Sequence, residues 1–180
     1  MKLNKILISM GIVLASVSTA SIAAYTGTPT NGTIEFKGSL VNSACGLAAN
    51  SSPVMVDFAE ITTAALKNGA RAGNEKKNIE LQNCDITVAQ HATVTYQPNT
   101  ANPNDASLAA MLSGTAKGAG IGLTDNAGKD VVWGQASSPV NLTNGKSVIP
   151  FMAYVKADNS SSAVEPGDFT SQINFQIDYQ

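Results

Sequence analysis

The chain is poor in the residues that catalysis and metal binding require. It contains a single histidine, His91, and two cysteines, and only 13% of its residues are charged. A hydrolytic triad needs a general base, and no nucleophile motif lies near His91 in the sequence. Zinc sites use three or four ligands, and one histidine is a weak basis for such a set. We therefore expect no catalytic residue, no metal, no cofactor and no enzyme activity.

Clustered positive charge is also scarce. The formal net charge is −2, and the only close basic pair is Lys76-Lys77. Nucleic acids and anionic membrane surfaces bind basic patches, so we expect no nucleic-acid partner. The glycine-rich run 118–122 (GAGIG) has neither the dinucleotide spacing nor the following Lys-Ser/Thr of a phosphate loop. We interpret it as a loop that runs into a strand.

Only the start of the chain contains a long apolar run. Two lysines precede an apolar stretch over residues 6–17, and small residues follow it. The stretch is short for a membrane span, and the order of charge, apolar run and small residues is typical of a secretory signal peptide. We assign residues 1–23 to this signal, with cleavage after Ala23 or a neighbouring alanine. An uncleaved membrane anchor is the alternative.

The two cysteines, Cys45 and Cys84, are expected to form a disulfide. An exported chain meets an oxidising compartment, where paired thiols oxidise. The bond would close a loop of about 40 residues, which the chain-entropy model values at ~4 kcal/mol. Two free thiols or a metal-binding pair are the less favoured alternatives.

Short alternating segments fill the rest of the chain. Apolar and polar residues alternate with a period of two, as in half-buried strands, and turn residues separate the segments. The pattern predicts an all-β antiparallel sandwich or barrel of seven or more strands. The alternating segments are residues 54–58, 79–81, 92–96, 121–123, 149–155 and 173–179.

Four local features carry more specific predictions. Residues 62–67 (TTAALK) and 108–112 (LAAML) are candidates for short helical turns. Asn144-Gly145 lies between two candidate strands and favours a type I′ hairpin. Pro150 interrupts a candidate strand, which predicts a bulge or an edge position there.

The first alternating run of the exported chain covers residues 30–41 (TNGTIEFKGSLV). Gly32, Ile34 and Phe36 share one face, and Glu35 and Lys37 lie on the other. A half-buried strand at this place needs a surface to pair with. The sequence alone leaves open whether that surface belongs to the same chain or to another.

Several runs together resemble one known family. Residues 31–45 (NGTIEFKGSLVNSAC) are similar to the start of the type 1 fimbrial major subunits of Gram-negative bacteria. The resemblance continues through the runs 61–69, 78–84 and 148–157, and it closes with QINFQIDYQ at 172–180, in which Tyr179 is penultimate. It covers essentially the whole chain after the signal.

The resemblance implies an incomplete immunoglobulin-like β-sandwich, a pilin fold that lacks its last strand and has one disulfide. It implies a signal peptide at 1–23, a donor-strand extension at 24–38 and a pilin domain at 39–180. Gly32, Ile34 and Phe36 would be the donor residues. The acceptor groove of the neighbouring subunit would be lined by the last strand, through Ile173, Phe175, Ile177 and Tyr179.

The implied function is that of a structural subunit of a chaperone–usher fimbria. The implied partners are identical or related subunits in a linear polymer, a periplasmic chaperone and an outer-membrane usher. The chain would pass through the periplasm to a cell-surface fimbrium, and we expect no host receptor to bind through it. A minor or adaptor pilin is one alternative, and a self-complete periplasmic binding domain is a less favoured one. The chain is too short for an adhesin with a separate lectin domain.

Overall fold

The computed structural model describes residues 27–28, 30–160 and 163–180. The chain divides into two units, residues 1–39 and residues 40–180. All named strands and helices belong to the second unit. The predicted signal peptide at 1–23 lies outside the described residues. Within the described residues, no helix has the length and apolarity needed to cross a membrane.

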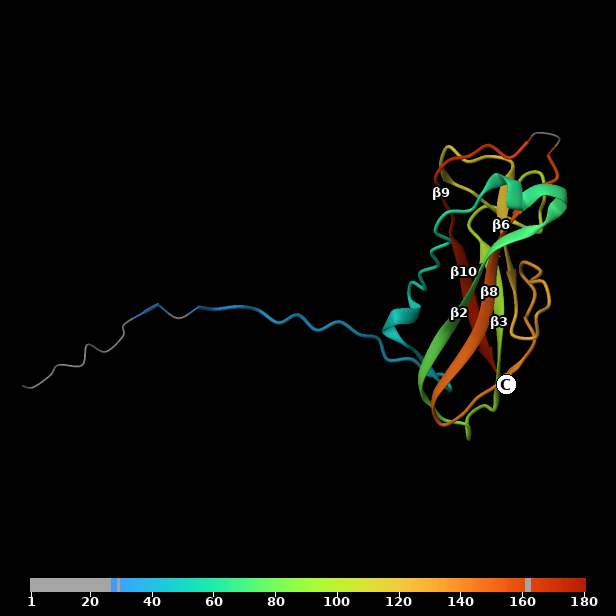
Figure 1. The fold of residues 1–180 in the computed structure, drawn as a ribbon. Helices are drawn as coiled ribbons and strands as arrows, with labels where there is room; N and C mark the ends of the chain where they lie inside the picture. The colour runs from blue at the N-terminus through green and yellow to red at the C-terminus, as the bar shows by residue number, and fades with distance from the viewer. Residues whose placement is uncertain (1–26, 29, 161–162) are drawn as a thin grey trace, which may run out of the picture. The chain divides into compact units, whose positions relative to one another are not determined.

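The second unit is built from antiparallel sheets (Figure 1). The larger sheet has the order β1-β2-β8-β6-β4, with β1 at Gly46–Leu47, β2 at Arg71–Cys84, β8 at Gly145–Ala157, β6 at Ala119–Thr124 and β4 at Ala109–Ala110. The second sheet has the order β10-β3-β7, with β10 at Ile173–Tyr179, β3 at His91–Pro98 and β7 at Val140–Asn141. A small third sheet pairs β5 (Ser113–Gly114) with β9 (Phe169–Thr170).

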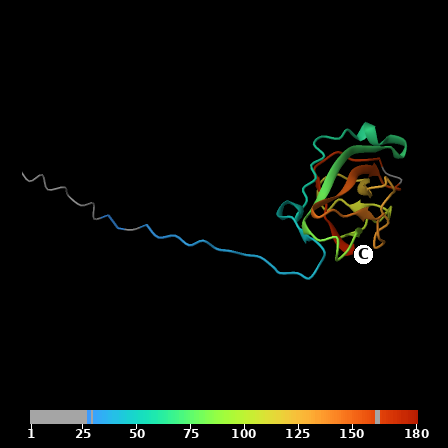
Figure 2. The same ribbon diagram turned by 90° about the horizontal axis from the view of Figure 1, so that it is seen from below.

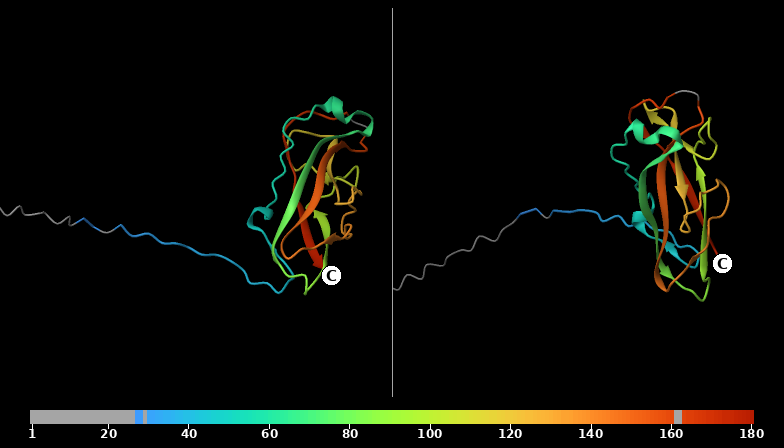
Figure 3. Two further views of the ribbon diagram at one scale, coloured as in Figure 1. Left: turned by 60° about the horizontal axis from the view of Figure 1, so that its bottom comes forward. Right: turned by 45° about the vertical axis from the view of Figure 1, so that its right-hand side comes forward.

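The main core lies between the first two sheets. Ile79, Leu81 and Ile149 from β2 and β8 are at most 1% exposed, and they share one cluster with Ala92 and Val94 of β3. Figures 2 and 3 show the long β2 and β8 ribbons packed over the second sheet. The predicted all-β sandwich is therefore confirmed.

The disulfide is also confirmed. Cys45 and Cys84 are bonded, and both side chains are buried in the main core. Cys45 immediately precedes β1, and Cys84 ends β2, so the bond joins the edge of the larger sheet to its neighbouring strand.

The two predicted helical turns have different outcomes. Residues 62–67 fall largely within the 3₁₀ helix η2 (Thr63–Gly69), which confirms that prediction; a shorter one, η1, covers Ala49–Ser51. The prediction for 108–112 is wrong, because Ala109 and Ala110 form strand β4 and pair with β6. A Cβ at Gly120 would lie 2.8 Å from the Leu108 Cβ, so this pairing brings two backbones unusually close.

The glycine-rich run 118–122 has a packing role. Gly120 and Gly122 lie inside the fully buried strand β6. The ring of Tyr154 on β8 occupies the space where a Cβ of Gly122 would lie. The expectation of a segment that runs into a strand is confirmed, and the glycines let neighbouring groups approach the backbone.

The predicted hairpin at Asn144-Gly145 is wrong. The strand before it, β7, pairs with β3, and the strand after it, β8, pairs with β2, so this connection crosses between the sheets. The Asn144 side-chain oxygen instead accepts a hydrogen bond from the Ile86 amide at 3.0 Å. Pro150 opposes Asn78 on β2, while β6 lies beside β8 only from Met152 onward. The edge interpretation of Pro150 is therefore correct.

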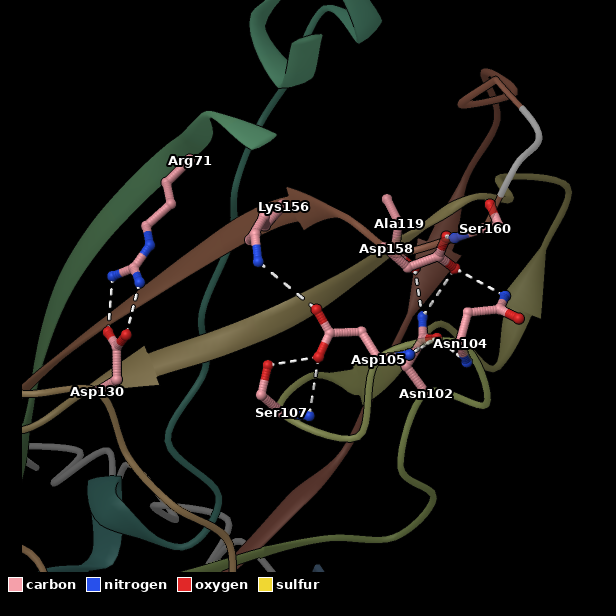
Figure 4. A network of polar contacts seen from close by, with 10 residues as sticks. All are labelled: Arg71, Asn102, Asn104, Asp105, Ser107, Ala119, Asp130, Lys156, Asp158 and Ser160. Carbon is pink, nitrogen blue, oxygen red and sulfur yellow. Dashed lines mark hydrogen bonds and ion pairs between the residues drawn. The ribbon is translucent and has the colours of Figure 1, made fainter. Parts of the chain in front are cut away.

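An ion pair between Arg71 and Asp130 joins β2 to the segment after β6 (Figure 4). Arg71 on β2 donates two hydrogen bonds of 2.7 Å to the carboxylate of Asp130, and its guanidinium lies 4.1 Å from the centre of the Tyr154 ring. The hydrogen bonds from Arg71 lower the pKa of Asp130, despite an opposing contribution from burial. This bidentate geometry is the strong form of the arginine–carboxylate pair.

A second group of polar contacts organises the turn before β4. Lys156 of β8 lies 3.5 Å from the carboxylate of Asp105, which also accepts the Ser107 hydroxyl at 2.6 Å. Asn102 and Asn104 both donate to Asp158, at 3.3 and 3.1 Å (Figure 4). These contacts satisfy polar groups of which several are buried, and they fix the turn against β8.

Candidate functional site

Strand β10 has a strand on one side only within the described residues. It pairs with β3 along its whole length, from Ile173 opposite Pro98 to Tyr179 opposite Ala92. The ladder continues past the strand, because Gln180 and His91 exchange two backbone hydrogen bonds of 2.8 and 2.9 Å. The other edge of β10 carries no ladder in this part of the chain.

The apolar face of β10 is only partly covered. Ile173, Phe175, Ile177 and Tyr179 are half-buried and pack against the main core, and the residues between them are exposed. On the paired strand β3, by contrast, Ala92 and Val94 are fully buried and Tyr96 is 3% exposed. The core is therefore closed beneath β3 and open beneath β10. The four predicted acceptor residues all lie on this open face.

A second unpaired edge lies in residues 53–61. Val54, Val56 and Phe58 are half-buried and pack against the core, while Met55 between them is 75% exposed. The segment alternates as an extended chain does. Among the described residues, it has no ladder partner and no backbone hydrogen bond to another strand. The predicted alternation at 54–58 is confirmed, but the predicted strand is not, because the segment has no ladder partner among the described residues.

Residues 53–61 approach the start of β10. The rings of Phe58 and Phe169 lie 6.1 Å apart, and Phe58 and Ile173 both pack against the main core and against a second cluster of buried residues, which contains Leu66 and Val155. At the far end of β10, the Tyr179 hydroxyl donates a hydrogen bond to the Cys45 carbonyl. Figures 1 and 3 show the teal segment that leads up to η2 on the same side of the unit as β10. We call this region, formed by residues 53–61 and β10, the open side.

Beyond the Phe58 end, the open side continues into a small hollow. Its apolar lining includes Ile61, Leu66, Met111, Val155 and Phe169. Leu66 and Val155 are buried in the second core cluster, with Phe58 and Ile173 packed against that cluster. The apolar surface of the open side is therefore continuous with a second core region.

Trp133 also bears on the core near the open side. Its ring is half-buried and packs against both core clusters, as Phe58 and Ile173 do. Its indole N–H is buried and has no hydrogen-bond partner among the described residues. An unsatisfied buried donor lowers folding stability by about 1–3 kcal/mol, so the apolar packing of the Trp133 ring has to offset this loss.

The predicted donor residues lie in the first unit. The described part of residues 27–39 contains no helix or strand. Ile34 and Phe36 are 80% and 87% exposed, and a Cβ at Gly32 would contact nothing within 4 Å. The run 30–41 is therefore not a half-buried strand in the single chain. Its role as a donor strand stays a prediction.

The arrangement of the open side favours binding of another polypeptide strand. No group of three or more His, Cys, Asp or Glu that could hold a metal occurs in the portion of the chain that is described. His91 is exposed, and its ring Nδ1 lies 2.9 Å from the Asn141 side-chain oxygen. Half-buried apolar residues of 53–61 and β10, together with free backbone groups, are instead the features of a surface that accepts another strand.

Sequence reasoning found one edge of the open side and missed the other. The resemblance to pilins implies β10 as an acceptor strand. Sequence reasoning treated residues 54–58 as an ordinary strand, although the same alternation now describes an edge without a partner. Pro53 at the start of that segment was the available signal, because proline is restricted to strand edges and starts.

The comparisons with known proteins agree with this geometry. A family model described as fimbrial protein matches residues 34–180. A major fimbrial subunit of Proteus mirabilis is 53% identical over 184 residues, with both chains fully covered. A type-1 fimbrial protein A chain of Escherichia coli is 33% identical over 187 residues, again with full coverage of both chains.

Two solved structures match both sequence and fold. A subunit from a chaperone–usher pilus, studied for the uncoiling of its rod, aligns with a TM-score of 0.73 and 26% identity, covering 87% of this chain and all of that one. The P pilus rod subunit PapA aligns with a TM-score of 0.63 and 26% identity, covering 77% of this chain and all of that one. The expected fold class is confirmed.

Proposed function

Because the chain belongs to the fimbrial protein family, we propose that it is the major structural subunit of a chaperone–usher pilus. In this proposal, residues 24–38 of one subunit insert into the open side of the next. The observation that carries the proposal is that one chain contains both an incompletely covered core and an exposed apolar segment that could cover it. The second unit has an apolar core with two unpaired edges, and the first unit has exposed alternating apolar residues.

Insertion would pair the free edge of β10 and bury the exposed apolar side chains of the donor segment. An added strand beside β10 pairs its free backbone groups, and Ile34 and Phe36 cover the half-buried face of β10. Burial of each side chain contributes roughly 1.5–3 kcal/mol, and each ladder hydrogen bond adds ~0.5–1.5 kcal/mol net. Over about ten residues the sum is on the order of 10 kcal/mol or more, which makes dissociation very slow. Repetition of this contact gives a linear polymer.

The same physics explains why helper proteins are part of the proposal. An unpaired edge above an exposed apolar face aggregates unless it is covered. A periplasmic chaperone would cover the open side before assembly, and an outer-membrane usher would be the site of exchange. The chain would then reach the cell surface within the fimbrium, as a structural protein and not as an enzyme.

Substitutions in the donor segment test the proposal. Ile34→Asn together with Phe36→Asn removes the apolar anchors without adding charge. We expect surface-sheared material from this variant to lack fibres in electron micrographs and to lack the ladder that wild-type fibres give on unheated denaturing gels. Thr33→Asn with Ser39→Asn changes the opposite face and should leave the ladder intact. Normal fibres from the first variant would contradict the proposal.

A deletion separates assembly from folding. A chain without residues 24–37 keeps the whole open side, so it should still co-purify with the periplasmic chaperone while failing to extend a fibre. Loss of both chaperone binding and fibre extension would point to misfolding of the deletion variant. Chaperone co-purification of the Ile34→Asn/Phe36→Asn variant is then the independent check.

A further inference from the structure

The apolar pattern of the donor segment leaves its register underdetermined. Gly32, Ile34 and Phe36 alternate with polar residues, and Gly38 and Leu40 continue the same phase. A slip of one residue would turn the apolar side chains to solvent. A slip of two residues keeps them facing inward, so the apolar pattern alone discriminates poorly against that register. Another feature has to distinguish registers two residues apart.

The open side and the segment before β10 carry only negatively charged side chains. Residues 53–62 contain Asp57 and Glu60, residues 163–180 contain Glu165, Asp168 and Asp178, and neither stretch contains lysine or arginine. Glu165 pairs with Lys117 at 3.2 Å. Within the described chain, the other four acids are exposed and form no ion pair.

The donor segment carries one charge of each sign. Glu35 and Lys37 are the only charged residues between 24 and 45. In the single chain they pair with each other at 3.2 Å, with 76% and 81% of their side chains exposed. Both lie on the face opposite Ile34 and Phe36, so an inserted strand presents them at the rim, next to the acids.

The direction of insertion decides which acid meets which charge. Antiparallel pairs are the more stable kind, and every ladder between the named strands is antiparallel. A strand antiparallel to β10 places its later residues, around Lys37, beside the Ile173 end. Phe58 packs at that end, and the adjacent Asp57 is exposed on the outer face of its segment.

We infer that Lys37 of one copy forms an ion pair with Asp57 of the next copy, and that this pair selects the register of the inserted strand. The inference rests on the proposed function. A slip of two residues brings Glu35 to Asp57, where like charges repel. The i, i+2 spacing of Glu35 and Lys37 therefore rewards one register and penalises a neighbouring one that the apolar pattern tolerates.

A charge exchange in full-length fibres tests this inference. Lys37→Glu and Asp57→Lys should each make fibres dissociate in urea about two- to fivefold faster, the range expected for an exposed pair. The double variant Lys37→Glu/Asp57→Lys should return to a rate near that of wild type. Lys146→Glu reverses an exposed lysine on β8 and should leave the rate unchanged.

Salt separates pairing from packing. In about 1 M sodium chloride the screening length falls to roughly 3 Å, so the difference between wild type and Lys37→Glu should shrink. The inference would be overturned if fibres of the double variant dissociate as fast as those of the faster single variant. It would also be overturned if Lys37→Glu fibres dissociate at the wild-type rate. Rescue of Lys37→Glu by Asp178→Lys instead of Asp57→Lys would overturn it too, and would indicate insertion in the opposite direction.

The same preparation distinguishes this inference from the proposed function. If strands do not insert, Ile34→Asn/Phe36→Asn leaves fibres intact, and the whole scheme fails. If strands insert without the ion pair, that variant loses its fibres while Lys37→Glu dissociates at the wild-type rate.

Discussion

The hydroxyl of Tyr179 donates a hydrogen bond to the carbonyl oxygen of Cys45, 3.3 Å away. This contact joins the C-terminal end of β10 to the disulfide-bonded residue before β1. The Tyr179 ring is half-buried, and burial raises the pKa of its hydroxyl. The hydroxyl therefore stays protonated and available as a donor at neutral pH.

Tyr179→Phe should weaken the second unit slightly. The ring keeps its packing, and only the long hydrogen bond to Cys45 is lost, so we expect a loss of about 0.5 kcal/mol, at the lower end of the usual range. Urea unfolding of the subunit with its open side covered, as in assembled fibres, compares the variant with wild type. Asp178→Asn, on the exposed face of the same strand, is the matched control and should be neutral. A loss above roughly 1.5 kcal/mol would show that the hydroxyl has another role.

Trp133→Phe should be neutral or stabilising within about 1 kcal/mol. Phenylalanine retains much of the ring contact with both core clusters and removes the unpartnered N–H. Trp133→Ala removes the ring as well and should cost about 3–5 kcal/mol. Thermal unfolding of the two variants beside wild type gives the comparison. A large loss in Trp133→Phe would mean that the indole N–H does find a partner in solution.

Acid should destabilise the second unit through Asp130 and Asp125. Hydrogen bonds from Arg71 lower the pKa of Asp130. Burial raises the pKa of Asp125, but hydrogen bonds from Ser138 and from two backbone amides outweigh it, so its pKa is lowered as well. Both carboxyls bind a proton less readily when folded than in the unfolded chain, where the ordinary value is 3.8.

Their stabilising contribution is therefore present above about pH 4 and lost as the pH falls through 3.8 towards the folded pKa values. Unfolding free energies measured from pH 7 down to pH 2.5 should show this decline. Asp130→Asn should lower stability at pH 7 and flatten the decline, because the carboxyl at position 130 no longer titrates. An unchanged slope in that variant would contradict the assignment.

Period-two alternation was a sound guide to strand positions and a poor guide to pairing. It located β10 and the inward residues of β2, β3 and β8, because side-chain direction depends only on the local backbone. It could not tell that residues 53–61 have no strand beside them, since an unpaired edge and a paired one carry the same pattern. The resemblance to pilins, and not the periodicity, pointed to β10 as an open edge.

The local failures have a tertiary cause. Residues 108–112 have good helix formers, yet Ala109 is fully buried in a strand that pairs with β6, where a Cβ at Gly120 would lie 2.8 Å from the Leu108 Cβ. Asn144-Gly145 has hairpin chemistry, but its flanking strands belong to different sheets. In both places long-range packing overrides local propensity, which a single sequence does not display.

The open side also has a thermodynamic consequence under the proposed function. A core that two molecules complete makes unfolding free energy a joint property of neighbours, so the melting temperature should rise with the degree of polymerisation. A linear array of such subunits exposes one uncovered core and one free extension, whatever its length. The aggregation-prone surface per subunit therefore falls as the inverse of the number of subunits. Per subunit, a long fibre offers unassembled chains fewer places to bind than any shorter array does.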